Sequence, residues 1–133
     1  MKLEEIMQEE YRVLQLLYEA LLEQNGYLVK KEVFSLDKIV KVIDERSKDV
    51  AKLEIERRRI TQKRPMREIV AEKGDTSLKN LYDDIVELLE KMQLQKDTNE
   101  ALIKQWLGFT NQMLRALNPN RGANTYNALG KTR

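Results

Sequence analysis

The segment LEEIMQEEYRVLQLLYEALLEQN, residues 3–25, decides the fold class of this chain. Its apolar side chains recur at steps of three and four residues and form two neighbouring rows: Met7, Tyr11, Leu14, Tyr18 and Leu21 in one, and Leu3, Ile6, Val13, Leu17 and Ala20 in the other. Together the rows make an apolar face that is wider than a two-stranded coiled coil needs. The pattern predicts a helix inside a bundle. It should end at Asn25-Gly26, because both residues tolerate the left-handed conformation.

Three further segments show helical spacing. A second long helix is expected from Val33, or from Ser35 if its hydroxyl caps the helix, to Thr61. A short helix is expected over residues 65–73, with Pro65 at its first position and Gly74 after its end, and a last long helix over residues 78–117. Short turns between long helices favour antiparallel packing. We therefore predict an all-α fold, an elongated antiparallel bundle of three long helices with one short connecting helix. The bundle should occupy residues 1–117, followed by a C-terminal tail over 118–133 that is flexible or orders on binding.

Composition supports a single helical domain and argues against an enzyme. The chain has 133 residues, of which 41% are hydrophobic, 35% charged and only 6% aromatic. It contains neither cysteine nor histidine, which excludes disulfides, thiolate catalysis and the commonest metal ligands. No phosphate-binding loop or nucleophile motif occurs. We expect no enzymatic activity, no cofactor and no bound metal.

Several charged residues lie in or beside the apolar rows. The adjacent acids Glu9 and Glu10 point about 100° apart on a helix, so they are expected on a solvated face rather than in a paired carboxylate site. Arg46 and Arg57 interrupt the apolar row of the second helix. Each of these arginines either extends its charged head to water at the edge of the row or pairs with a facing acid.

The last helix carries the candidate binding residues. Gln95 and Asn99 interrupt its apolar row, where buried amides would fix the register of packed helices. Beyond them the row resumes with Leu102, Trp106, Phe109, Met113 and Leu117. Because the first helix is the shortest of the three long ones, the end of the last helix should project and leave this row under-covered. An exposed apolar row usually has a partner, although the same spacing also suits a core.

The ends of the chain and its charges bear on location and partners. The N-terminal residues are rich in acids, and no apolar run approaches the length of a membrane span, so we expect a cytosolic protein without membrane insertion. Basic residues gather at Arg57, Arg58 and Arg59, at the expected end of the second helix, where cations favour the helix dipole. Neighbouring acids dilute this charge and no aromatic residue lies within the group, so we expect no nucleic-acid binding.

The order of these elements resembles the FlgN family of flagellar export chaperones. The resemblance lies in VFSLDKIVKVIDERSKDVAKLEIERRRIT, residues 33–61, and in residues that match family positions: Lys41, Leu53, Glu54, Arg57 and Arg58 in that segment, then Asn99, Leu102 and Ile103. Gln95 stands where the family often has Asn. The ending TYNALG, with Thr125, Tyr126 and Gly130, is similar to a common family ending.

The resemblance implies a specific function. Proteins of this kind bind the C-terminal helical segments of hook–filament junction (hook-associated) proteins. They prevent premature assembly of these clients and deliver them to the flagellar type III secretion apparatus. The client-binding residues implied here are those of the last apolar row and of the tail: Leu102, Trp106, Phe109, Met113, Leu117, Tyr126 and Leu129. The alternative is a scaffolding bundle that forms a homodimer through its last helix.

Overall fold

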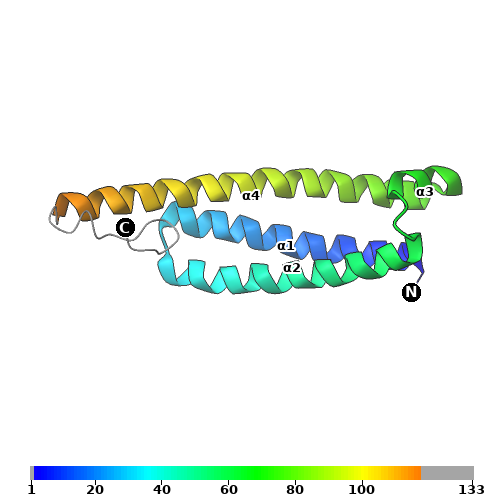
Figure 1. Cartoon of the computed structure of the whole chain (residues 1–133), viewed down its shortest axis with the longest axis horizontal. Helices are drawn as coiled ribbons and strands as arrows, with labels where there is room; N and C mark the ends of the chain where they lie inside the picture. The colour runs from blue at the N-terminus through cyan, green and yellow to red at the C-terminus, as the bar shows by residue number, and fades with distance from the viewer. Residues whose placement is uncertain (1, 118–133) are drawn as a thin grey trace.

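The computed structural model describes residues 2–117, which form four helices. In chain order they are α1 (Leu3–Lys30), α2 (Val33–Thr61), α3 (Met66–Lys73) and α4 (Thr76–Leu117). Figure 1 shows an elongated arrangement in which α1 and α2 form an antiparallel hairpin, α3 lies at one end, and α4 runs back along α1. Three long helices and one short helix confirm the predicted all-α class, and the described part of the chain contains no strand.

The first helix does not end where the sequence predicted. It continues through Asn25-Gly26 to Lys30, and Lys31 ends it in the left-handed conformation with φ 58°. The amides of Lys31 and Glu32 donate to the carbonyls of Leu28 and Tyr27, as in a Schellman cap. Glycine within a helix costs about 1 kcal/mol. Packing of the last turns of α1, where Leu28 is buried, outweighs that cost.

The other helix boundaries are close to the predicted ones. α2 begins at Val33, and Ser35 is not its cap. Pro65 directly precedes α3 rather than occupying its first position, and Gly74 ends that helix with φ 61°. The side chain of Asp75 then caps α4 by accepting a hydrogen bond of 2.9 Å from the Ser77 amide.

The core lies around α1, which packs against both α2 and α4. Ten of its 28 residues are buried, whereas α2 buries only two of 29. At the α3 end, one cluster of buried residues joins α1, α3 and α4: Leu3, Met7, Ile69, Val70 and Leu78. Further along, a second cluster joins α1 and α4: Leu14, Leu21, Leu88 and Met92.

The packing partners differ from those of a closed antiparallel bundle. α4 runs parallel to α1 and packs on it, and no comparable contact joins α2 to α4. The wide apolar face of α1 explains this arrangement, since it offers enough surface for two partner helices, and residues of both rows, such as Leu3 and Met7, share one cluster with α3 and α4. On α4, Leu88 is buried, whereas its neighbour Leu89 is 46% exposed.

Two glycine substitutions test where α1 ends. Replacing Gly26 with Ala should raise the free energy of unfolding by about 0.5–1 kcal/mol, because the position is helical and an added Cβ meets nothing within 4 Å. The matched control is Gly74→Ala, which should lower it by about 1–2 kcal/mol because Gly74 has a positive φ. Urea unfolding followed by circular dichroism measures both. A destabilising Gly26→Ala substitution would show that α1 stops at the glycine.

Candidate interaction surface

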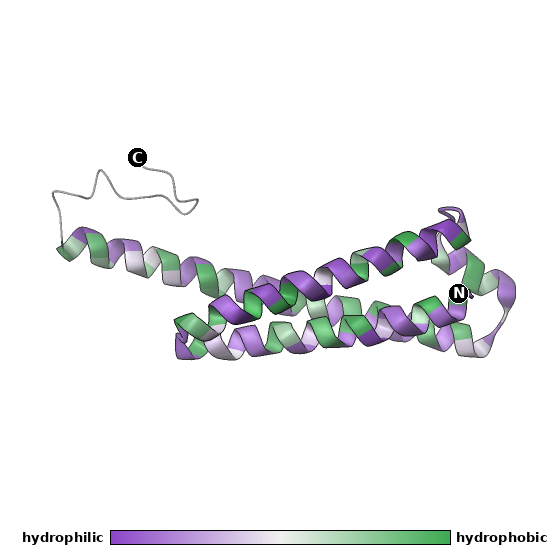
Figure 2. Ribbon diagram, turned by 90° about the horizontal axis from the view of Figure 1, so that it is seen from below, coloured by the Kyte–Doolittle hydropathy of each residue, from purple (hydrophilic) through white to green (hydrophobic). Residues whose placement is uncertain are grey.

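The C-terminal part of α4 extends beyond the rest of the bundle. Figures 1 and 2 both show α4 running well past the turn between α1 and α2. The ammonium of Lys31, at this turn, lies 5.6 Å from the centre of the Phe109 ring. This cation–π contact marks where the covered part of α4 gives way to the projecting part.

The projecting part of α4 presents apolar side chains to solvent. We call the residues of the row Leu102, Trp106, Phe109, Met113 and Leu117 the C-terminal stripe. Leu102 and Trp106 are half-buried, whereas the exposed fraction is 55% for Phe109, 45% for Met113 and 76% for Leu117. Leu107 and Leu114 beside the stripe are also exposed. The structure thus shows the under-covered row that the sequence predicted, and exposed apolar surface of this kind usually marks an interaction site.

Two of the predicted binding residues, Tyr126 and Leu129, lie outside the described residues, as does the whole predicted tail over 118–133. Their role remains a prediction from the sequence.

A buried amide fixes α4 against α1 at the base of the stripe. The side chain of Asn99 is 2% exposed. Its Nδ2 donates to the Leu21 carbonyl at 2.9 Å and to Gln24 Oε1 at 3.0 Å. Its Oδ1 accepts from Asn25 Nδ2 at 3.2 Å and from Gln95 Nε2 at 3.0 Å. All four hydrogen-bonding positions of the amide are therefore used, which suits a residue that sets helix register.

A second buried polar contact joins α1 to α2. Glu10 is 7% exposed, so its predicted place on a solvated face is wrong. Its Oε1 lies 3.0 Å from Nε of Arg57, which confirms the facing-acid alternative for that arginine. Burial raises the pKa of the Glu10 carboxyl, and the nearby guanidinium only partly opposes this shift. The sequence could not show the pairing, because the two residues lie on different helices.

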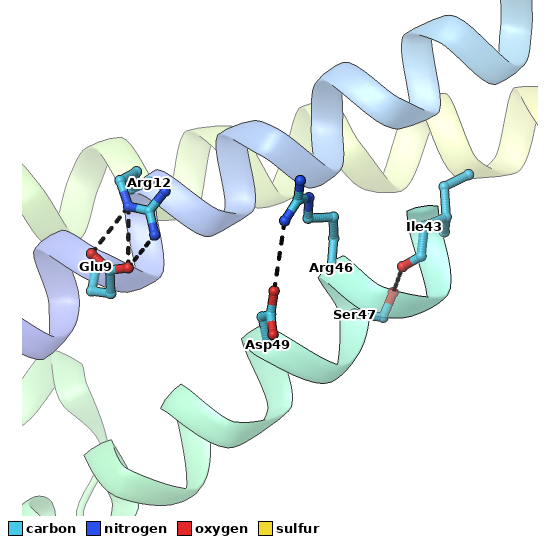
Figure 3. Close-up of polar contacts among 6 residues, drawn as sticks. All are labelled: Glu9, Arg12, Ile43, Arg46, Ser47 and Asp49. Carbon is cyan, nitrogen blue, oxygen red and sulfur yellow. Dashed lines mark hydrogen bonds and ion pairs between the residues drawn. The ribbon is translucent and has the colours of Figure 1, made fainter. Parts of the chain in front are cut away.

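The more exposed charges nearby form local pairs along the helices. Figure 3 shows Arg12 paired with Glu9 on α1 and Arg46 paired with Asp49 on α2. Arg46 therefore pairs within its own helix, at 3.8 Å, and not with a facing acid. The Arg12 guanidinium holds the pKa of the Glu9 carboxyl below its usual value.

The basic cluster at the end of α2 is partly neutralised by acids. Arg58 lies 2.7 Å from Glu54, and Arg64 pairs with Glu72 of α3. These contacts fit the interpretation that cations occupy the C-terminal end of the helix for local electrostatic reasons.

The charged residues along and beyond the C-terminal stripe are all basic. Glu100 is the last acidic residue of the chain, and five basic residues follow it: Lys104, Arg115, Arg121, Lys131 and Arg133. Lys104 and Arg115 lie on the same stretch of α4 as the stripe. The apolar stripe is therefore accompanied by positive charge alone, although the whole chain has a net charge of only +2.

The fold and this surface define a class of protein. It is an all-helical bundle whose last helix projects with exposed apolar side chains, the kind of surface that usually marks an interaction site. Comparison of the sequence with known families identifies the family, since the FlgN protein family matches residues 1–133, the whole chain. The chain belongs to the FlgN family of flagellar export chaperones, which is a chaperone family and not a family of enzymes. No curated protein and no solved structure gave a match.

Two further observations concern residues 2–117. None of their helices is both long and apolar enough to cross a membrane. No group of three or more acids among them could hold a metal ion.

Proposed function

We propose that this flagellar export chaperone acts in the cytoplasm on hook–filament junction proteins. It binds their C-terminal helical segments, prevents premature assembly, and delivers them to the flagellar type III secretion apparatus. The single observation that carries the proposal is the C-terminal stripe, a row of apolar side chains exposed on the projecting end of α4 in a member of the FlgN family.

The chemistry of the stripe specifies the client segment. An amphipathic helix would lay its apolar face against Phe109, Met113 and Leu117, in the manner of helix-in-groove recognition. Lys104 and Arg115 beside the stripe favour acidic residues at the edge of that client face. Tyr126 and Leu129, three residues apart in the tail, supply two more apolar anchors.

Substitutions in the stripe test the proposal. The variant Phe109→Ala/Met113→Ala should weaken binding of a client's C-terminal fragment by about 1–3 kcal/mol, since both side chains are exposed and can serve as anchors. Deletion of residues 118–133 and the single change Tyr126→Ala should each weaken binding as well. Calorimetric titration with the client fragment measures the affinity.

The control for these variants is Leu94→Ala, which removes a leucine from the same helix but outside the stripe. Leu94 is 70% exposed, so its loss should change neither binding nor the free energy of unfolding. If the stripe variants bind the fragment as tightly as the control does, the client surface lies elsewhere.

The same exposed stripe also favours the second candidate, a scaffold that forms a homodimer through α4. Light scattering separates the two functions. A stable dimer that Phe109→Ala/Met113→Ala converts to a monomer, together with no affinity for client fragments, would favour the scaffold.

A further inference from the structure

A long groove lies between α2 and α4. Both helices pack on α1 and make no comparable contact with each other, so α1 forms the floor of the groove and they form its walls. One part of the groove has a volume of about 450 Å³ over Leu17 and Leu21, and the other has about 350 Å³ over Met7 and Leu14. Leu89 of α4 lines both parts, so they are neighbouring stretches of one groove.

The walls of the groove are mainly apolar along its length. Val40 of α2 is 52% exposed, and Val86 and Leu89 of α4 are 38% and 46% exposed, although all three line the groove. Ser47, a polar lining residue of α2, directs its hydroxyl to its own helix and donates to the Ile43 carbonyl at 2.8 Å (Figure 3). Its hydroxyl therefore needs no partner from an occupant of the groove.

One end of the groove holds polar atoms that lack a directed hydrogen bond. Glu10 Oε1 and Arg57 Nε are buried and form an ion pair, but neither has a hydrogen-bond partner of good geometry. Glu54 also lines this end, 3.8 Å from the same guanidinium, so two carboxylates face one arginine. An occupant that donates a hydrogen bond to Glu10 would satisfy the buried acceptor, since an unsatisfied acceptor costs free energy, whereas Arg57 Nε is a donor and needs an acceptor instead.

We propose that the α2–α4 groove seats one amphipathic helix of the exported client. The apolar face of that helix would lie over Leu89, and one amide or basic side chain would point toward Glu10. This inference rests on the proposed function, because it names a second binding surface for the same client.

The dimensions and position of the groove favour a client helix. Its α4 wall runs from Tyr82 to Ile103, about 32 Å, which a helix of about 20 residues would span. Ile103 at the end of the groove lies next to Leu102, the first residue of the C-terminal stripe, so the groove ends at the level of α4 where the stripe begins, although the two side chains point about 100° apart. The projecting end of α4 from a second copy of this chain, residues 102–117, is about 24 Å long and would leave part of the groove open.

Matched aspartate substitutions test the groove. Leu89→Asp and Val40→Asp place a charge on its two walls, and Leu94→Asp and Ile55→Asp place the same charge on exposed apolar positions of the same helices outside it. With the C-terminal helical fragment of a hook–filament junction protein as the probe, the two groove variants should lose about tenfold or more in affinity, and the two controls should lose none. Circular dichroism and urea unfolding show whether each variant is folded.

A label on a polar lining residue gives an independent readout while the apolar residues of the groove stay unchanged. The chain has no cysteine, so Ser47→Cys can carry a single environment-sensitive fluorophore, and Lys48→Cys gives the same label outside the groove. The fluorophore at position 47 should shift to the blue when the fragment is added, and the one at position 48 should not.

The outcomes separate the groove from the proposed function. If stripe variants lose affinity and the groove variants keep it, the groove inference is overturned and the chaperone function stands. If the unmodified chain binds no fragment, the proposed function fails and the inference fails with it. A dimer of the free chain that Leu89→Asp makes monomeric would show that a second copy occupies the groove, which also overturns the inference.

Discussion

Replacing Arg57 with Ala should lower the free energy of unfolding by about 3–5 kcal/mol. The Arg57 side chain is 20% exposed and that of Glu10 only 9%, so the substitution leaves a buried carboxylate without its cation. The Coulombic attraction that now offsets the desolvation of Glu10 would be lost, and the desolvation would remain. Urea unfolding near neutral pH measures the effect.

Two controls isolate the burial of the pair. Arg58→Ala removes a neighbouring arginine whose side chain is 63% exposed and whose partner is Glu54, and it should cost less than about 1 kcal/mol. The double variant Glu10→Gln/Arg57→Met removes both charges at similar volume, and it should restore most of the stability lost in Arg57→Ala. A loss for Arg57→Ala as small as that for Arg58→Ala would contradict the assignment of a buried pair.

The pH dependence of stability provides a second test of the buried contact between Glu10 and Arg57. Because the folded-state pKa of Glu10 is raised above its usual value of 4.5, the folded protein holds this proton at a pH where the unfolded chain has released it. Protonation of Glu10 therefore favours the folded state at low pH, and that contribution is lost as the pH rises through the raised pKa. The stability of the natural chain relative to Glu10→Gln should increase on acidification.

The exposed carboxyls of Glu9 and Glu72 make stability depend on pH in the opposite direction. The arginine partners of Glu9 and Glu72 lower the pKa values of these two acids, so their contribution is present above the usual pKa and falls in acid. Both acids are present in the natural chain and in Glu10→Gln. Their effects therefore cancel in the difference between the two unfolding curves.

Periodicity was a good guide to the helices because it reports local amphipathicity. The double apolar row of residues 3–25 predicted a helix with more than one partner, and α1 does pack against both α2 and α4. The same reasoning failed at Gly26, because the stop signal of Asn-Gly is local and the contacts that extend α1 to Lys30 are tertiary. It also failed for Glu10, since the burial of a charge depends on a partner on another helix.

The candidate site was predictable in outline and not in its full extent. The length of α4 relative to α1 was enough to predict a projecting stripe with Phe109, Met113 and Leu117. The groove was not predictable, because the spacing of apolar residues on α2 indicates a face that packs without showing how fully it is covered. Val40 and Leu89 are left open to solvent because α2 and α4 both pack closely on α1 and make no comparable contact with each other.

Replacing Asn99 with Leu should lower the free energy of unfolding by about 2–4 kcal/mol. The two side chains have similar size, but leucine would leave Gln24 Oε1, Asn25 Nδ2 and Gln95 Nε2 without their present partner. Gln95→Ala is the matched control, because it removes a single hydrogen bond from the same network and should cost about 1 kcal/mol. A neutral Asn99→Leu substitution would mean that apolar packing alone sets the register of α4.

Asn99→Asp separates hydrogen bonding from side-chain size. The substitution puts an oxygen in place of the Nδ2 that now faces two acceptors, the Leu21 carbonyl and Gln24 Oε1. The new carboxylate should destabilise the fold more than leucine does near neutral pH, and it should recover part of the loss in acid, where its O–H can donate again. The same variants should also weaken client binding. A slip of α4 by one helical turn would move Phe109 about 5.4 Å relative to Lys31 and change how far the stripe projects. The buried amide of Asn99 therefore contributes to binding by fixing the register of α4 against α1.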